Sequence, residues 1–184
     1  LTGITPALSQ NTYETTIELI KEAKKNNVTV IYDPNYRKKL WEQKEFKNFY
    51  MKIEKDVDIL LAGSSEAEIL FGKKQYIEIA ENVQNKLLVI KDGAKGAYFA
   101  SKNEKIFKSA YKVPEVDPVG AGDAFAAGLI YGIQTYGIDD ITTISKYALG
   151  MGAIATTTYG DFYGLPTIKE LEQFLNHQIN DVER

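Results

Sequence analysis

Residues 117–123 read Asp-Pro-Val-Gly-Ala-Gly-Asp, and residues 124–132 continue as the apolar run Ala-Phe-Ala-Ala-Gly-Leu-Ile-Tyr-Gly. The glycines Gly120 and Gly122 let the backbone turn sharply and come close to a ligand. The apolar run predicts a helix, whose first N–H groups lack intrahelical partners and lie at the positive end of the helix dipole. The stretch therefore predicts a glycine loop that binds an anion where a helix begins.

The acidic residue Asp123 closes this loop at the expected start of the helix. A carboxylate beside a bound anion is unfavourable unless it has a chemical task. The task that fits is accepting a proton from an attacking hydroxyl group. The ordinary alternative is that Asp123 caps the helix behind a glycine turn. The local pattern leaves both interpretations open.

Helical and strand patterns alternate along the rest of the chain. Apolar runs at residues 28–32, 58–62 and 87–90 are typical of buried strands in a parallel sheet. A first helix is predicted from a cap at Ser9 or Asn11 through Asn26. Further helices are predicted over residues 44–55, 63–71, 76–83, 124–136, 141–157 and 168–175, and Gly72 is expected to end the helix at 63–71. Residues 97–100 and 105–108 flank a polar turn and predict a β-hairpin. We therefore expect one α/β domain, a three-layer sheet with helices on both faces and a hairpin.

Polar residues follow the first predicted strand, where residues 33–37 read Asp-Pro-Asn-Tyr-Arg. Ligands of open α/β sheets bind at the carboxyl ends of strands, so these side chains suggest a polar binding site. The guanidinium of Arg37 offers a fork of donors that suits a carboxylate or phosphate. The alternative is that Asp33 forms a turn and Arg37 is a surface charge.

Two further stretches admit an ordinary and a functional interpretation. Ser64 or Ser65, with Glu66 or Glu68 nearby, predicts a capped helix start with acidic residues in its first turn. Gly93 and Gly96 predict the turn that leads into the hairpin. The apolar set in residues 44–55 is predicted to be core rather than an aromatic ligand site.

Composition limits the class of protein. The 184 residues are 44% hydrophobic and carry 22 basic and 25 acidic side chains, a net charge of −3. This charge gives no basic field for nucleic acid or an anionic membrane, and no apolar run approaches the ~20 residues of a membrane span. Cysteine is absent, which excludes disulfides and thiolate sites and fits a reducing cytoplasm. We expect neither nucleic acid nor a membrane as a partner.

The stretch at residues 117–132 resembles the second signature of the PfkB family, which includes ribokinase and fructokinase. The leading Asp117, the Gly-Ala-Gly-Asp core and the small-residue helix all agree with that signature. The Asp-x-Asn-x-Arg element at residues 33–37, followed by Leu40-Trp41, is similar to that of 2-keto-3-deoxygluconate kinases and bacterial fructokinases. The resemblance covers residues 1–184 and implies a ribokinase-like, Rossmann-like fold. It matches the nucleotide-binding and catalytic, carboxyl-side portion of a family member.

The resemblance implies an ATP-dependent phosphotransferase that uses Mg²⁺. Asp123 would accept the substrate's hydroxyl proton, while Gly120, Ala121 and Gly122 would present amides to the transferred phosphoryl group. The predicted substrate-binding residues are Asp33, Asn35, Arg37 and Asp123. The predicted nucleotide-binding residues are Lys91, Gly93, Gly96, Ala121, Gly122, Ala148 and Gly152.

Two residues are implied as metal-site residues by the same resemblance. Glu66 matches a glutamate that organises Mg²⁺ through water, but Gly63 stands where the family often has asparagine, so contacts made by that asparagine are absent. Asp117, with the turn at residues 159–161, is expected near a monovalent cation, K⁺.

The predicted substrate is a small sugar or sugar acid, 2-keto-3-deoxygluconate first, with fructose or ribose as alternatives within the family. We expect the chain by itself to lack turnover and the full-length form to be a homo-oligomer. A different class, a non-catalytic nucleotide-binding regulator on the same fold, is disfavoured because Asp123 is retained. A dinucleotide-dependent oxidoreductase would carry a Gly-x-Gly-x-x-Gly turn after its first strand, and none is present.

Overall fold

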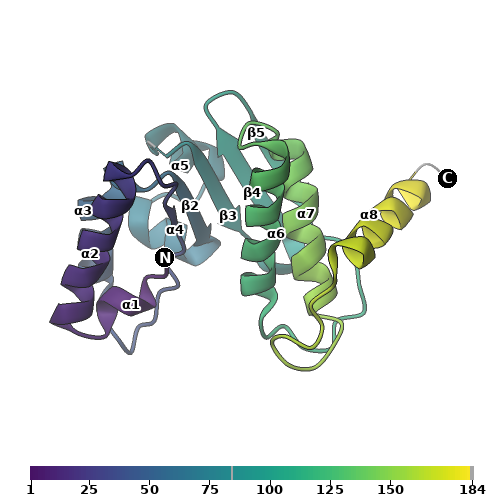
Figure 1. Ribbon diagram of the computed structural model, residues 1–184, viewed down its shortest axis with the longest axis horizontal. Helices are drawn as coiled ribbons and strands as arrows, with labels where there is room; N and C mark the ends of the chain where they lie inside the picture. The colour runs from purple at the N-terminus through teal and green to yellow at the C-terminus, as the bar shows by residue number, and fades with distance from the viewer. Residues whose placement is uncertain (84, 183–184) are drawn as a thin grey trace. The chain divides into compact units, whose positions relative to one another are not determined.

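The structure is a computed structural model that describes residues 1–83 and 85–182. Figure 1 shows the order of its elements. They are α1 (Ile4–Ala7), α2 (Gln10–Lys25), β1 (Ile31–Tyr32), α3 (Gln43–Ile53), η1 (Glu54–Asp56), β2 (Ile59–Gly63), α4 (Ser64–Phe71), α5 (Tyr76–Asn82), β3 (Leu87–Lys91), η2 (Gly93–Lys95), β4 (Gly96–Ser101), β5 (Lys105–Ser109), α6 (Ala121–Tyr136), α7 (Ile141–Ala155) and α8 (Ile168–Val182). They form two compact units, residues 1–92 with 98–105, and residues 93–97 with the chain from 106 onward.

The strands form one sheet in the order β1-β2-β3-β4-β5. β1 runs parallel to β2, with Ile31 opposite Ile59, and β2 runs parallel to β3, with Gly63 opposite Lys91. β4 and β5 are sheet neighbours joined by three residues, a connection that only an antiparallel hairpin allows. The predicted α/β class, with its parallel strands and hairpin, is confirmed.

The core of the first unit lies between the sheet and α2, α3 and α4. Successive side chains of β2 and β3 point to opposite faces, and those of both faces are buried, which explains the uninterrupted apolar runs. α2 and α3 lie side by side (Figure 1), where the rings of Tyr13 and Phe49 meet edge to face with centroids 5.0 Å apart. The apolar set of α3 is core, as expected, and consists of Phe46, Phe49, Tyr50 and Ile53.

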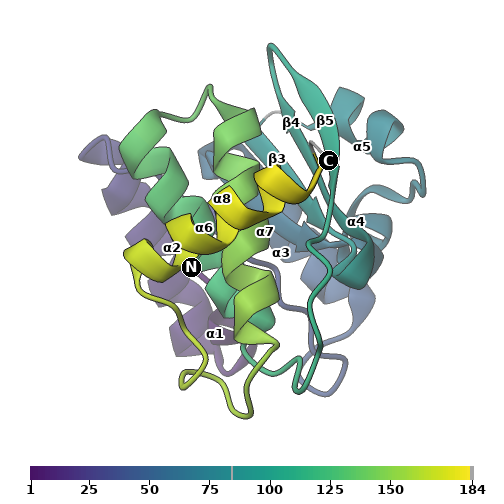
Figure 2. The same ribbon diagram turned by 90° about the vertical axis from the view of Figure 1, so that its right-hand side faces the viewer.

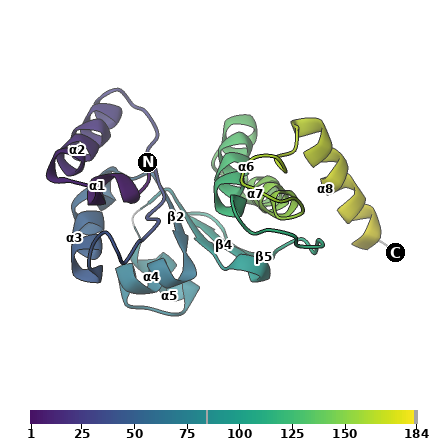
Figure 3. The ribbon, with the colours of Figure 1, turned by 90° about the horizontal axis from the view of Figure 1, so that it is seen from below.

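The second unit is built on close helix packing. α6 and α7 run side by side in Figure 2, and a Cβ added at Gly128 of α6 would lie 2.5 Å from the Tyr147 carbonyl oxygen of α7. Leu171 and Leu175 of α8 pack on α7 beside Gly150. Figure 3 shows the ribbons of α7 and α8 from below. Within the described residues, no helix is long and apolar enough to cross a membrane.

The first predicted strand is shorter than its apolar sequence indicated. β1 contains only Ile31 and Tyr32, because Val28, Thr29 and Val30 do not pair as regular strand residues. The Val28 N–H donates to Ala23 O of α2, and the Val30 N–H donates to a side-chain oxygen of Asp58. Side-chain and helix-end acceptors therefore take the place of ladder partners.

The structure differs from the sequence prediction at two other helices, α1 and α8. Residues 4–7 form the one-turn helix α1, which is not among the helices predicted from the sequence; Pro6 is tolerated there because it lies in the first turn. The last helix extends to Val182 instead of ending near Leu175.

The Asp58 carboxylate is buried and makes several hydrogen bonds and ion pairs. It is 5% exposed, and its oxygens accept hydrogen bonds from Lys24 Nζ at 2.9 Å and from the Val30 N–H at 2.9 Å. Lys86 Nζ lies 3.0 Å from Asp58 Oδ1. Burial alone would raise the pKa of Asp58, but the Val30 N–H and the two ammonium groups outweigh burial and lower it.

Candidate active site

The glycine loop turns directly into α6. Gly120 is the N-cap residue, and its backbone is left-handed, with φ 79° and ψ −10°. The N–H of Ala121 donates to Pro118 O at 3.2 Å, so this amide is already used, in contrast to its predicted role toward a phosphoryl group. The N–H groups of Gly122 and Asp123 have no partner within the described residues, so they are the amides that this loop offers to an anion.

Asp117 joins this loop to the segment that follows α7. One carboxylate oxygen accepts the Val119 N–H and the other accepts the Gly160 N–H, each at 3.0 Å. These two hydrogen bonds hold the pKa of Asp117 below its usual value. The backbone N–H of Asp117 itself donates to Thr156 O at 3.0 Å. The loop before α6 and the segment after α7 are therefore one connected structure within the second unit.

Gly120→Ala is expected to disrupt this connection. A left-handed alanine costs roughly 1–2 kcal/mol, and a Cβ at this position would also lie 2.6 Å from the Asp161 carbonyl oxygen, a backbone atom. Gly72→Ala is the matched control, because Gly72 is also left-handed but has no atom within 4 Å of an added Cβ. Thermal unfolding of both variants should show the larger loss for Gly120→Ala. Equal losses would mean that the contact with Asp161 does not matter.

Asp123 lies in the first turn of α6 and is exposed. Its carboxylate makes no hydrogen bond or ion pair to any residue that the structure describes, and the N-cap position belongs to Gly120. The capping interpretation of Asp123 is therefore wrong. An exposed carboxylate beside two free N–H groups is the arrangement that a proton acceptor next to an anion requires.

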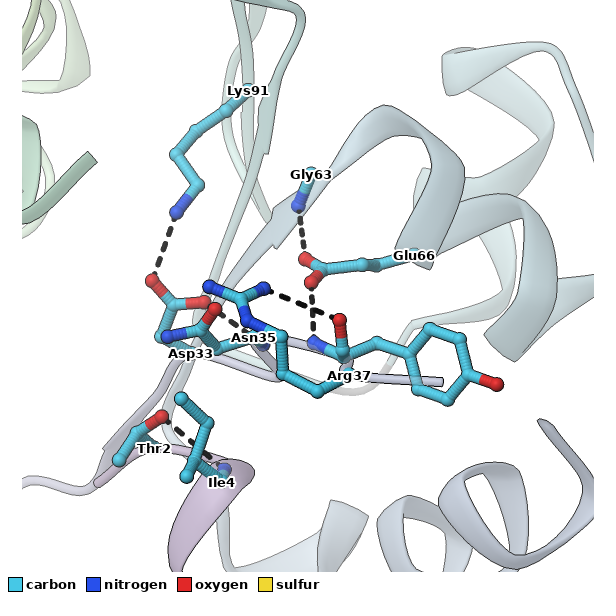
Figure 4. Close-up of polar contacts among 9 residues, drawn as sticks. Thr2, Ile4, Asp33, Asn35, Arg37, Gly63, Glu66 and Lys91 are labelled. Carbon is cyan, nitrogen blue, oxygen red and sulfur yellow. Dashed lines mark hydrogen bonds and ion pairs between the residues drawn. The ribbon is translucent and has the colours of Figure 1, made fainter. Parts of the chain in front are cut away.

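In the first unit, polar side chains gather where β1, β2 and β3 end (Figure 4). Asp33 follows β1 and receives two hydrogen bonds: the Asn35 N–H donates to Oδ1 at 3.2 Å, and Lys91 Nζ donates to Oδ2 at 2.8 Å. Lys91 is the last residue of β3. The structure thus joins Lys91, predicted to bind nucleotide, to Asp33, predicted to bind substrate.

Glu66 binds two backbone N–H groups. Its Oε2 accepts the N–H of Gly63 and its Oε1 accepts the N–H of Tyr36, both at 2.7 Å (Figure 4). Gly63, rather than Ser64 or Ser65, is the N-cap residue of α4, since Glu66 in the first turn closes the cap on it. The helix-start interpretation of Glu66 is confirmed, and a link to the Asp33–Arg37 segment is added.

Arg37 is exposed, and its Nη1 donates to Tyr36 O at 3.2 Å. It forms no ion pair with any residue that the structure describes, so its remaining donors are available to an anion.

The other predicted nucleotide-binding residues all lie in the second unit. Gly93 and Gly96 have positive φ values of 56° and 129°, as the turn before β4 requires. Gly152 of α7 packs against the first turn of α6, since an added Cβ would lie 3.4 Å from Ala121 O. Ala148 is fully buried and offers no surface to a ligand in this conformation.

The described residues contain no cluster of three or more histidine, cysteine, aspartate or glutamate side chains that could hold a metal ion. Mg²⁺ in phosphotransferases is held by one or two carboxylates together with substrate phosphates and waters, and it needs no such cluster. The second lone pair on each oxygen of Glu66 fits a metal-bound water.

A parallel α/β sheet with polar side chains at the strand ends and a glycine loop that opens a helix are both typical of α/β proteins that bind phosphate groups. Comparison with known families narrows this class. The profile described as "pfkB family carbohydrate kinase" matches residues 1–168. The chain belongs to the PfkB family of carbohydrate kinases.

Similar proteins agree with this assignment. The chain is 34% identical to 2-dehydro-3-deoxygluconokinase of Bacillus subtilis (strain 168), over 97% of this chain and 56% of that protein. A fructokinase double mutant from Vibrio cholerae O395, solved with fructose, ADP and a potassium ion, has a TM-score of 0.83 at 31% identity, covering 93% of this chain and 58% of that one. A ribokinase II from E. coli with ATP and Mg²⁺ has a TM-score of 0.84 at 27% identity, covering 96% and 57%. The chain spans little more than half the length of these relatives.

Proposed function

We propose that residues 1–184 are the nucleotide-binding and catalytic portion of an ATP-dependent kinase that phosphorylates a hydroxyl group of a small sugar or sugar acid. One observation carries the proposal: at the start of α6, the Asp123 carboxylate and the N–H groups of Gly122 and Asp123 all lack a partner among the described residues. Membership of the PfkB family supports it.

In this mechanism the protein positions groups and neutralises charge. Asp123 accepts the proton of the sugar hydroxyl as its oxygen attacks the γ-phosphorus of ATP. The free N–H groups, with the positive end of the α6 dipole, stabilise the negative charge on the transferred phosphoryl group. ADP leaves as the bond between its β-phosphate oxygen and the γ-phosphorus breaks.

The residues present fit two metal ions that accompany nucleotides in solved relatives. When bound, Mg²⁺ neutralises the ATP phosphates, and Glu66 is the residue we propose to hold one of its waters. K⁺ was bound in the fructokinase structure described above. For this chain we propose a monovalent cation next to Asp117, an anionic side chain shared by two loops.

For the substrate we propose 2-keto-3-deoxygluconate, also called 2-dehydro-3-deoxygluconate, ahead of fructose and ribose. The relative with 34% identity acts on this sugar acid by its name, and the free donors of Arg37 suit a carboxylate. The test is kcat/KM of the full-length kinase for the three substrates. The proposal expects the highest value for the sugar acid, and a higher value for fructose or ribose would contradict it.

Homo-oligomer formation stays a prediction, which sedimentation of the full-length protein would check.

Arg37→Lys keeps the charge but loses the planar fork. Loss of one charge-assisted hydrogen bond costs roughly 1.5 kcal/mol, so KM for the sugar acid should rise about tenfold in the full-length kinase. Lys38→Arg, at an exposed neighbouring position, is the control and should leave KM unchanged. Unchanged kinetics of Arg37→Lys would make Arg37 a surface charge.

A further inference from the structure

We propose that Lys91 and Glu66 are positioning residues, which hold the Asp33–Arg37 segment at two points so that Asn35 and Arg37 meet the sugar in one conformation. The inference rests on the proposed function for its consequence, but the contacts on which it depends lie entirely within the first unit. It assigns Lys91 to the sugar segment, whereas the sequence comparison implied a role toward the nucleotide.

The first point is the ion pair between Lys91 and Asp33. β2 lies between β1 and β3, so the Lys91 side chain reaches past the end of β2 to a carboxylate that follows β1. Both side chains are largely buried, with exposed fractions of 22% for Lys91 and 24% for Asp33. The other oxygen of Asp33 accepts the Asn35 N–H. Lys91 therefore fixes the carboxylate that in turn fixes the backbone of Asn35.

The second point is the bidentate contact of Glu66. Its carboxylate binds the Gly63 N–H at the end of β2 and the Tyr36 N–H in the segment, both at 2.7 Å. A carboxylate that accepts two backbone N–H groups forms charge-assisted hydrogen bonds, which are stronger than neutral ones. The segment is thus bound to β2 through Glu66 and to β3 through Lys91, as Figure 4 shows.

The segment benefits from this support because its backbone is unusual at one residue. Asn35 has a φ of 42°, in the left-handed region, which asparagine tolerates better than other non-glycine residues but which is sparsely populated without local hydrogen bonds to hold it. The two points hold Asn35 from both sides: the Asp33 carboxylate accepts the N–H of Asn35, and the Glu66 carboxylate accepts the N–H of Tyr36. Arg37 follows directly, so a relaxed segment would displace the guanidinium.

The kinetic test uses the full-length kinase with the variants Lys91→Met, Lys91→Arg and Glu66→Gln. Lys102→Met and Glu172→Gln are controls with the same charge changes at exposed positions. Misplacement of a group by about 1 Å can lower the catalytic rate by up to about 100-fold. We expect Lys91→Met and Glu66→Gln each to raise KM for the sugar on the order of 10-fold. For Lys91→Met, KM for ATP should stay within about twofold of wild type, whereas Glu66→Gln can also change the dependence on Mg²⁺ and ATP. Lys91→Arg keeps the positive charge, so its KM for the sugar should stay close to that of the wild type.

Three outcomes would overturn the inference. A rise in KM for ATP with unchanged KM for the sugar would place Lys91 at the nucleotide. A change only in the Mg²⁺ dependence of Glu66→Gln would make Glu66 a metal-site residue alone. An equal loss for both substrates together with a lower Tm would indicate general structural support. If Lys91→Met does not fold, Lys91→Gln, which keeps a donor without the charge, undergoes the same comparison.

A second measurement does not depend on catalysis. Hydrogen exchange followed by NMR should show slowed exchange of the Tyr36 amide in the wild-type kinase, and faster exchange in Glu66→Gln. The Asn35 amide should likewise exchange faster in Lys91→Met. These results can hold even if the full-length protein phosphorylates no sugar, so failure of the proposed function is distinguishable from failure of this inference. Equal exchange rates in wild type and variants would contradict the inference.

Discussion

Asp123→Asn is expected to lower kcat of the proposed kinase by about 10²–10⁴-fold, or roughly 3–5 kcal/mol of activation free energy. The substitution keeps the size of the side chain but removes its ability to accept a proton. ATP affinity should survive, because the N–H groups of Gly122 and residue 123 remain at the start of α6. The Tm should be unchanged, because the Asp123 carboxylate makes no hydrogen bond or ion pair to the described residues.

The matched control is Asp139→Asn, which makes the same change at another exposed aspartate of the second unit. Its kcat and Tm should equal those of the wild type. Steady-state turnover, ATP titration and thermal unfolding are measured on both variants. Turnover of Asp123→Asn within a few-fold of wild type would exclude Asp123 as the base. A collapse of kcat with a lower Tm would point to an effect on folding instead.

Asp58→Ala should destabilise the first unit by about 1–3 kcal/mol, the usual cost of leaving a buried N–H group without its acceptor. The substitution leaves the Val30 N–H without its acceptor and removes the anion between Lys24 and Lys86. Trp41, the single tryptophan of the sequence, is buried in this unit, so its fluorescence during urea unfolding reports the loss.

Asp56→Ala is the control for Asp58→Ala. Asp56 is two residues away and makes no hydrogen bond or ion pair to the described residues, so its removal should change the free energy of unfolding by less than about 0.5 kcal/mol. If the two variants unfold at the same urea concentration, the ion pairs of Asp58 contribute no net stability.

The same carboxylate predicts a pH dependence. The pKa of Asp58 is lowered in the folded protein, so the ionised form stabilises the fold above the pKa of the unfolded chain, about 4. This stabilisation is lost as the pH falls through the lower, folded-state pKa. The stability difference between wild type and Asp58→Ala should therefore be full at pH 7 and should shrink progressively below about pH 4. A difference that does not change with acidification would contradict this account.

Much of the fold follows from local sequence. Ser9 caps α2 by accepting the Thr12 N–H, Gly72 ends α4 in a left-handed conformation, and the glycine loop opens α6, all at predicted positions. The paired apolar runs of β2 and β3 are buried on both faces, as a parallel sheet requires. These features depend on residues a few positions apart, which sequence patterns report directly.

The site was only partly predictable because its decisive contacts are long-range. Lys91 and Asp33 are 58 positions apart, and Asp117 and Gly160 are 43 apart. No local pattern reveals such pairs, although the polar residues after each strand mark the edge where they meet. The length of the first strand was overestimated for the same reason. The Val30 N–H donates to the side chain of Asp58, 28 positions away, and not to a neighbouring strand. The capping interpretation of Asp123 failed because a left-handed Gly120 already occupies the N-cap position.

We propose that this chain carries the phosphoryl-transfer machinery of a carbohydrate kinase. The most direct test incubates the full-length protein with ATP, Mg²⁺, K⁺ and 2-keto-3-deoxygluconate, fructose or ribose, and follows the products by ³¹P NMR. The account predicts a new phosphate-monoester signal that grows in step with ADP, and its loss in Asp123→Asn. Binding of ATP without a phosphorylated product from any of these substrates would contradict the account and favour a non-catalytic nucleotide-binding regulator.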